Sequence, residues 1–304
     1  MLNQELSDLE LIVVDDGSTD ATPELLHTIT DSRMHCVAQP NLGISAAMNA
    51  GMRAATGEFV ARLDSDDLWM PDMLLTLVHV LDTRPEIAVA YGKGQAIDAN
   101  GHQLADVFGM PEHFPGESLR SLAYDDFTCN IALVARRSGF DLAGPYDESL
   151  IANEDWDMWL RLAHHCRFYY VDRILACVRF HDENFTGLGS PRLASVLGSR
   201  TLPLNRLFGD PDLPAEVRAM KSVAYTNVHL FCGQRWLQAG HLNQALHEFS
   251  RAIEISQHRL PTAIRAIWLA LVAPRLKGWS WGRRVINWQA AIRRAHRASK
   301  PNRE

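Results

Sequence analysis

The chain has 304 residues, enough to bury a sizeable core in one large domain or in a domain with an appendage. With 47% hydrophobic residues, 22% charged residues and a net charge of -6, its composition is ordinary for a globular protein. Five cysteines, odd in number, widely spaced and without a CxxC pair, argue against a disulfide framework or a zinc site and fit a reducing cytoplasm.

The charge is distributed unevenly along the chain. From Arg259 onward there are eleven Lys or Arg residues and a single acid, Glu304. A basic tail on an acidic body indicates an anionic partner, either a membrane surface or nucleic acid. Nucleic-acid binding has no motif to support it and is not expected. The polar start shows no signal peptide, and without a run of 18 apolar residues no membrane-spanning helix is expected.

Within this tail, residues 264–284 mix aromatic, aliphatic and Arg residues in the manner of an interfacial amphipathic helix. The alternative is a helix that docks on the rest of the protein through its Trp residues. The first interpretation predicts a cytoplasmic protein whose C-terminal tail contacts the inner face of the membrane peripherally.

The first part of the chain alternates short apolar strands with helices. Strands are predicted at 9–14, 37–38 and 58–63, and helices at 25–29, 44–52 and 73–81. An acidic turn, 15–20, follows the first strand. This alternation predicts an α/β fold with a mostly parallel sheet flanked by helices and a ligand at the carboxyl ends of the strands.

The later part of the chain is less regular and then becomes helical. Further strands are predicted at 87–92, 130–134, 167–171 and 174–181, with a helix at 156–163 and a loop-rich, pocket-shaping segment at 93–128. From Leu193 the pattern is helical, which divides the chain into an α/β domain, 1–190, and an all-helical appendage, 191–304. Residues 236–253 resemble one tetratricopeptide helix pair; because an array needs about three copies, repeat-mediated partner binding is the alternative to a simple appendage.

Three carboxylates, Asp64, Asp66 and Asp67, follow the strand at 58–63. Carboxylates crowded at the end of a strand repel one another, which favours a bound cation. Mg²⁺ or Mn²⁺, held by one or two carboxylates and by the phosphates of a substrate, fits this pattern. The alternative is a helix N-cap, in which Asp66 or Asp67 caps the helix that starts near Pro71.

Four segments, in this order, resemble the family 2 glycosyltransferases, enzymes of the Rossmann-related GT-A fold. The segments are IVVDDGSTD, QPNLGISAAMNAGMRAATGEFVARLDSDDLWMPD, FDLAGPYDESLIANEDWDMWLRLA and VRFHDENFT. They span residues 9 to about 186 in the order and spacing of the family. Four ordered motifs are a far more specific signal than any one of them alone.

The resemblance implies a site for a nucleotide-sugar donor of the UDP-sugar kind. Asp16 would bind the nucleotide base, with Asp15 and Ser18 beside it. Asp64 and Asp66 would form the DxD pair, in which Asp66 is the direct metal ligand and Asp64 faces the ribose and the metal.

Three further donor-site residues follow from the same resemblance. Arg179 and His181 match a closing R-x-H motif near the diphosphate and the metal, with His181 as a metal ligand. The alternative for His181 is a surface histidine at the end of a strand. Asn49 would also contact the donor, but Met48 stands before it where the family often has Arg, so that a phosphate contact is missing.

For the chemical step, the resemblance implies that Asp155 is the catalytic base and Glu154 its neighbour near the acceptor. The alternative for Asp155 is a capping role at the start of its helix. A metal would neutralise the departing diphosphate, and a single base with in-line displacement would invert the configuration at C1. The predicted function is therefore an inverting glycosyltransferase that moves a sugar to a saccharide or lipid-linked acceptor.

Two other functions remain open at this stage. One is a degenerate or truncated glycosyltransferase-like domain that acts as a binding module, and the other is a nucleotidyltransferase, which gives no role to Glu154 and Asp155. Family members normally carry one more strand and helix before the strand at 9–14, and the chain as given starts after both. We therefore expect weak donor binding and an exposed sheet edge prone to self-association.

Overall fold

The computed structural model describes residues 1–181, 184 and 187–271. The strands in these residues are β1 (Leu11–Asp16), β2 (Met34–Gln39), β3 (Phe59–Ala61), β4 (Leu68–Trp69), β5 (Ile87–Asp98), β6 (Gln103–Phe108), β7 (Leu133–Arg136) and β8 (Arg167–Phe180). The first helices are α1 (Thr22–His27), α2 (Ile44–Ala54), α3 (Met73–Thr83), α4 (Ser118–Tyr124), the short 3₁₀ helix η1 (Asn130–Ala132), α5 (Arg137–Ala143) and α6 (Glu154–His165). After β8 come α7 (Leu193–Ser199), α8 (Leu202–Gly209), α9 (Ala215–Arg218), α10 (Lys221–Gln238), α11 (Leu242–Ile255) and α12 (Arg259–Leu271).

The strands form two separate sheets. β1 and β2 pair in parallel, from Leu11 opposite Met34 to Asp16 opposite Gln39. The larger sheet has the order β3-β7-β5-β8-β4, with β6 beside β5, and among its described pairings β5 and β8 alone are parallel. The expected α/β class with flanking helices is confirmed, and the pairing in the larger sheet is mixed rather than mostly parallel.

The segment 93–128, expected to be loop-rich, instead contains the end of β5, strand β6 and helix α4. β5 turns back into β6 at Gly101, whose φ of 88° favours glycine. The polar Gln95 is 7% exposed within β5, and its Nε2 donates to the carbonyls of Leu104 (2.7 Å) and Asp106 (3.1 Å). The sequence analysis did not predict this hairpin because a polar residue such as Gln95 is unusual in a buried strand. Here the side chain is tolerated because it satisfies backbone carbonyls of the partner strand.

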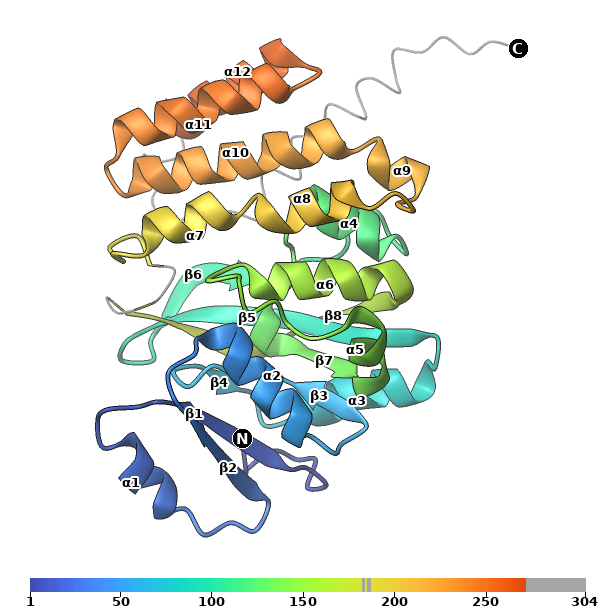
Figure 1. Ribbon diagram of the computed structural model, residues 1–304, viewed down its shortest axis with the longest axis vertical. Helices are drawn as coiled ribbons and strands as arrows, with labels where there is room; N and C mark the ends of the chain where they lie inside the picture. The colour runs from blue at the N-terminus through green and yellow to red at the C-terminus, as the bar shows by residue number, and fades with distance from the viewer. Residues whose placement is uncertain (182–183, 185–186, 272–304) are drawn as a thin grey trace.

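Helices cover both faces of the larger sheet (Figure 1). On one face, Trp156, Met158 and Leu162 of α6 are buried in the main hydrophobic cluster. On the other, Met73 and Leu77 of α3 are fully buried. α7 and α8, then α10, then α11 and α12 lie in further layers above α6 in Figure 1. The larger sheet therefore lies between α3 on one face and α6, with the further helices stacked above it, on the other.

α10 and α11 pack side by side as a helix pair, and α12 packs against them (Figure 1). A Cβ on Gly233 would lie 2.6 Å from Cε1 of Phe249, so a glycine at this position lets the two helices approach. Most of the predicted amphipathic tail, from residue 272, lies outside the described residues. Among the helices that are described, none combines the length and the apolar character needed to cross a bilayer.

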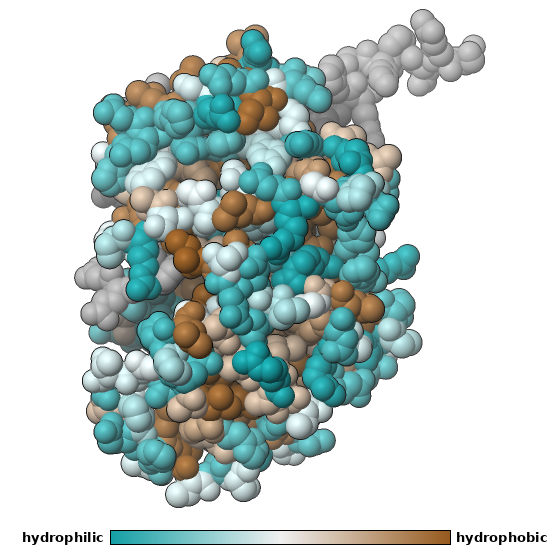
Figure 2. Space-filling view, viewed as in Figure 1, coloured by the Kyte–Doolittle hydropathy of each residue, from teal (hydrophilic) through white to brown (hydrophobic). Residues whose placement is uncertain are grey.

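β1 is apolar along Leu11–Val14, yet each of these residues is only half-buried. Among the described residues, β2 is its one strand partner, so its other backbone edge faces an opening that is also lined by Phe59 and Val60 of β3. Figure 2 shows hydrophobic side chains at the surface over these N-terminal elements, at the bottom of the view. An unpaired strand edge of this kind is a template for pairing with another chain.

Candidate active site

Asp16 ends β1 and holds the loop that leads into α2. Its Oδ1 accepts hydrogen bonds from Nε2 of Gln39 (2.7 Å) and the amide of Leu42 (2.9 Å), and its Oδ2 accepts one from the amide of Gly43 (2.9 Å). Burial opposes ionisation, but these three donors lower the pKa of Asp16 overall. Oδ2 retains room for one more donor, which is what recognition of a base N–H requires.

Asp15 and Ser18 form a tight turn directly after this strand. Oδ1 of Asp15 accepts the amide N–H of Ser18 at 2.8 Å, and the side chain and backbone of Ser18 together lower the pKa of Asp15. Ser18 is exposed. Both residues therefore shape the turn beside Asp16, and neither lines the main cleft.

The acids after β3 divide into two kinds. Asp67 is 9% exposed and accepts the backbone N–H of Arg179 at 2.7 Å, and burial raises its pKa to about 6. Asp64 and Asp66 are more exposed, at 41% and 36% of their side chains. Because α3 begins only after Asp72, the alternative that Asp66 or Asp67 caps this helix is excluded.

Asp66 contacts His181 directly. Its Oδ2 lies 2.9 Å from Nε2 of His181 and 3.3 Å from Nδ2 of Asn184, although the residues are more than 110 positions apart. Neighbouring ligands of an octahedral ion with bonds of about 2.1 Å lie about 3 Å apart, so this pair can share one Mg²⁺ or Mn²⁺. Within the described residues no three His, Cys, Asp or Glu side chains form a complete metal cage, and substrate oxygens would have to supply further ligands.

Arg179 joins the acidic loop to the end of β5. Its Nε donates to the carbonyl of Asp66 at 2.8 Å, and its Nη1 donates to the carbonyls of Asp98 (3.3 Å) and Ala99 (3.1 Å). These bonds position the 64–67 loop. Arg179 also lines the cleft, so its positive charge lies beside the acids of this loop.

Arg62 bridges the acids of the sheet and the acids of α6. Its Nε lies 2.8 Å from Oδ1 of Asp64, and its Nη1 lies 3.2 Å from Oε1 of Glu154. Only 12% of the Arg62 side chain and 6% of the Glu154 side chain are exposed. Burial and the neighbouring Asp155 raise the pKa of Glu154, and Arg62 opposes this shift. The sequence analysis did not identify Arg62, because nothing in its local pattern signals a partner 92 residues away.

Both carboxylate oxygens of Asp155 are held by N–H donors. Oδ1 accepts the backbone N–H of Trp156 at 2.7 Å, and Oδ2 accepts Nδ2 of Asn130. The orientation of the Asn130 amide is fixed in turn by Nε1 of Trp159, which donates to its Oδ1 at 2.6 Å. Asn130, predicted only as part of a strand, is therefore a second residue that the sequence analysis missed.

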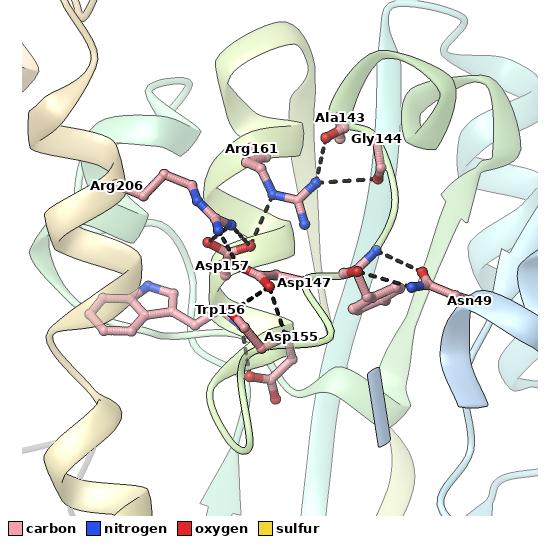
Figure 3. Close-up of polar contacts among 11 residues, drawn as sticks. Asn49, Ala143, Gly144, Asp147, Asp155, Trp156, Asp157, Arg161 and Arg206 are labelled. Carbon is pink, nitrogen blue, oxygen red and sulfur yellow. Dashed lines mark hydrogen bonds and ion pairs between the residues drawn. The ribbon is translucent and has the colours of Figure 1, made fainter. Parts of the chain in front are cut away.

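Asn49 ties α2 to the loop that precedes α6 (Figure 3). Its Nδ2 donates to the carbonyl of Tyr146 at 2.9 Å, and its Oδ1 accepts the backbone N–H of Tyr146 at 2.8 Å. Nδ2 also lies 2.9 Å from Oε1 of Glu148. Asn49 is 5% exposed and points into the protein, so the structure places it under the site rather than in the cleft.

We expect Asn49→Ala to lower the free energy of unfolding by about 1–3 kcal/mol, because it leaves buried backbone groups of Tyr146 without partners. Urea denaturation measures the change. Asn243→Ala, at an exposed position on α11, is the matched control and should leave stability unchanged. Equal stabilities of the two variants would contradict this account of Asn49.

Between α6 and α8, a salt-bridge network centred on a buried carboxylate fixes the same loop (Figure 3). Asp157 is 2% exposed and accepts Nε of Arg161 (2.9 Å) and Nη1 of Arg206 (2.6 and 2.7 Å). Arg206 also pairs with Asp147. The network orients the N-terminal turn of α6, which carries Glu154 and Asp155.

The sheet, the loops after its strands and the start of α6 surround one cleft of about 3260 Å³. Asp16, Asp66 and Asp155 all line it, although they come from β1, the loop after β3 and the start of α6. Asp64, Glu154 and Arg179 line it as well. The three acidic groups of the sequence thus line one cleft, and Arg62 connects two of them directly.

Comparison with known sequences agrees with the motifs. The family described as Glycosyl transferase family 2 matches residues 1–137. Chondroitin synthase of Escherichia coli is 29% identical over 185 residues, 60% of this chain and 26% of that protein. The glucosyltransferase WfaP of Escherichia coli is 27% identical over 162 residues, 53% of this chain and 61% of that protein. The chain thus spans about a quarter of the synthase and less than two thirds of WfaP.

Comparison with solved structures agrees with the fold. TarS of S. aureus, residues 1–349 in complex with UDP-GlcNAc, superposes with a TM-score of 0.59 at 17% identity, over 99% of this chain and 86% of that one. A mannosyltransferase of Pyrobaculum calidifontis, in complex with GDP-Man and Mn²⁺, gives 0.58 at 18% identity, over 97% and 79%. These likenesses support the GT-A-like fold, and the sequence match places residues 1–137 in glycosyltransferase family 2.

Proposed function

We propose that this chain transfers a sugar from a nucleotide-diphosphate donor, of the UDP-sugar kind, to a saccharide or lipid-linked acceptor. The observation that carries the proposal is the convergence of Asp16, Asp66 and Asp155 on one cleft. The names of relatives agree with it: WfaP is a transferase from UDP-Glc to a GlcNAc-diphosphoundecaprenol, and the TarS structure holds UDP-GlcNAc. In this proposal residues 1–190 carry the chemistry, and the helical residues from 191 flank it.

The donor would bind between β1 and the 64–67 loop. Asp16 would accept a base N–H, and Asp66 with His181, supported by Asp64, would hold a divalent cation. When bound, such an ion neutralises charge on the departing diphosphate. Arg179 adds a fixed positive charge at the same end of the cleft.

The acceptor would bind on the α6 side of the cleft. Asp155 receives N–H donors on both oxygens, from Trp156 and Asn130, which fix the orientation of its carboxylate. It would take the proton of the acceptor hydroxyl as the hydroxyl oxygen attacks C1. Glu154, held by Arg62, lies beside it. One base and one displacement predict inversion at C1.

A screen of UDP-glucose, UDP-N-acetylglucosamine and GDP-mannose with Mn²⁺, scored by release of the nucleoside diphosphate, tests this proposal. We expect release with at least one donor, and calorimetric titration should show dissociation constants well above micromolar. Weak binding is expected because β1, which carries Asp16, has one unpaired edge among the described strands. Micromolar binding would contradict the expected weakness, and no binding of any donor would contradict the function.

The second candidate is a binding module without catalysis. Met48 favours it, because this residue packs against the main hydrophobic cluster and supplies no charge to a phosphate. This candidate predicts donor binding without release of the nucleoside diphosphate, so the same screen separates the two functions.

A further inference from the structure

Asn153 lies immediately before Glu154 and Asp155 and has an unusual backbone conformation. Among the described residues other than glycine, it is the one with a positive φ, 62°. This left-handed region is unfavourable for a residue with a side chain, although Asn enters it more readily than most. Residues held there cluster at functional sites, where the surrounding structure has to impose the conformation. The contacts of Asn153 therefore decide how the first turn of α6 leaves the preceding loop.

The side chain of Asn153 does not cap its own helix. An N-cap side chain normally accepts an amide N–H of the first turn, but Asn153 makes no such bond. Its Nδ2 donates instead to the carbonyl of Val196 (3.1 Å) and to Oγ of Ser199 (3.0 Å), and its Oδ1 accepts Nη1 of Arg200 (3.1 Å). Asn153 is 9% exposed. Its left-handed conformation is thus held by three hydrogen bonds to the end of α7.

Arg200, which follows α7, also holds the residue on the other side of these acids. Its guanidinium carbon lies 5.1 Å from the ring centroid of Trp156 and 4.2 Å from that of Phe231 on α10. The backbone N–H of Trp156 in turn donates to Oδ1 of Asp155 at 2.7 Å. Arg200 therefore contacts both the residue before Glu154 and the residue after Asp155.

The segment that ends α7 is itself firmly placed. Only 14% of the Arg200 side chain is exposed, and its Nη2 lies 3.9 Å from Oδ2 of Asp126. Ser199 is 8% exposed, and its Oγ donates to the carbonyl of Val196 at 3.1 Å. Figure 1 shows α7 and α8 in the layer directly above α6. The helical region thus fixes the first turn of α6 from above, whereas Asn130 holds the Asp155 carboxylate directly.

We propose that Asn153 and Arg200 are positioning residues that aim the Asp155 carboxylate at the acceptor hydroxyl. The inference rests on the proposed function, in which Asp155 takes the proton of that hydroxyl. A general base must lie within hydrogen-bond reach of the proton it removes, and a displacement of about 1 Å lowers the rate strongly. The helices after β8 thereby contribute to the rate of transfer, without Arg200 itself having to touch the substrate.

Asn153→Ala tests this through release of the nucleoside diphosphate from UDP-glucose, UDP-N-acetylglucosamine or GDP-mannose, whichever the unchanged chain cleaves fastest with Mn²⁺. Water is the acceptor: its oxygen bonds to C1 as the bond from C1 to the diphosphate breaks, and its proton passes to Asp155. We expect kcat to fall about 10²-fold while the donor dissociation constant changes less than about twofold. Asn153→Gly should recover at least about tenfold of this loss, because glycine adopts a positive φ without strain.

A double-mutant cycle with Asp155→Asn separates positioning from a purely structural role. If Asn153 acts through Asp155, Asn153→Ala should lower kcat by less than about threefold once Asp155 is already Asn. A purely structural role predicts the same fold-loss in both backgrounds. Each kcat is expressed per folded molecule, with the folded fraction taken from circular dichroism.

Asn205→Ala is the matched control and should leave kcat unchanged. Asn205 is exposed on α8, in the same helical region, and its Oδ1 accepts the hydroxyl of Tyr225 at 2.6 Å. If Asn153→Ala does not fold, the same cycle with Arg200→Lys decides. Lysine keeps the charge but loses the planar fork that bonds Asn153 and stacks on the rings, so we expect a loss of about tenfold.

The outcomes separate this inference from the proposed function. Equal fold-losses in the two backgrounds, or a kcat of Asn153→Ala within about threefold of the unchanged chain, would overturn the positioning role and leave the proposed function standing. If the unchanged chain releases no nucleoside diphosphate from any of the three donors, the proposed function is wrong, and the positioning role is refuted with it.

Discussion

Replacing Asp155 by Asn should lower the rate of sugar transfer by about 10³-fold and leave donor affinity unchanged. A positioned general base contributes about 10²–10⁴-fold, and an amide cannot take the proton of the acceptor hydroxyl. The substitution keeps the shape of the side chain, and the carbonyl oxygen of the new amide can still accept the N–H of Trp156 or Asn130. Steady-state release of the nucleoside diphosphate, together with donor titration, measures both quantities.

Asp141→Asn, an exposed acid on α5, serves as the control and should retain the full rate. A rate within a few fold of the unchanged chain would show that Asp155 is not the base. If donor binding were lost as well, the substitution would have disturbed the donor end, and the assignment of Asp155 to the acceptor side would be wrong.

Arg62→Met should destabilise the protein by about 3 kcal/mol or more at neutral pH, because it leaves Glu154 buried without its cation. The loss should shrink when Glu154→Gln is added, because the amide carries no charge. A double-mutant cycle of the two substitutions, measured by denaturant unfolding, gives the coupling between them. Coupling close to zero would contradict the bridging role of Arg62.

The same variant has a defined dependence on pH. The pKa of Glu154 is raised above its ordinary value of 4.5, so the folded protein retains a proton that the unfolded chain has released. The contribution of this group to stability therefore falls as the pH rises above 4.5. Without Arg62 the pKa of Glu154 rises further, and Arg62→Met should lose more stability than the unchanged chain between about pH 5 and pH 8.

Local patterns predicted the elements whose own residues decide their structure. The apolar run at Leu11–Val14, the small-residue helix from Ile44 and the Trp-rich helix at Glu154 all appear close to the predicted positions. The ordered acidic motifs also indicated that Asp16 and Asp155 belong to one site, and both line the same cleft. A set of motifs in a known order indicates which distant residues share a site, whereas hydrophobic periodicity indicates only local helices and strands.

The features that the sequence analysis did not predict depend on contacts between residues far apart in the chain. Strand pairing could not be predicted, because the polar Gln95 becomes suitable for a buried strand only when β6 offers its carbonyls. Arg62 and Asn130 look like ordinary residues of a strand, and their roles arise from partners in α6.

The stack of helices above α6 has a consequence for how such a protein can diversify. The acidic end of the cleft is built by strand termini and their loops, whereas the opposite wall comes from α10 and α12, which follow the sheet in the chain. Substitutions on these two helices would therefore change one wall of the cleft without touching the acids at its other end.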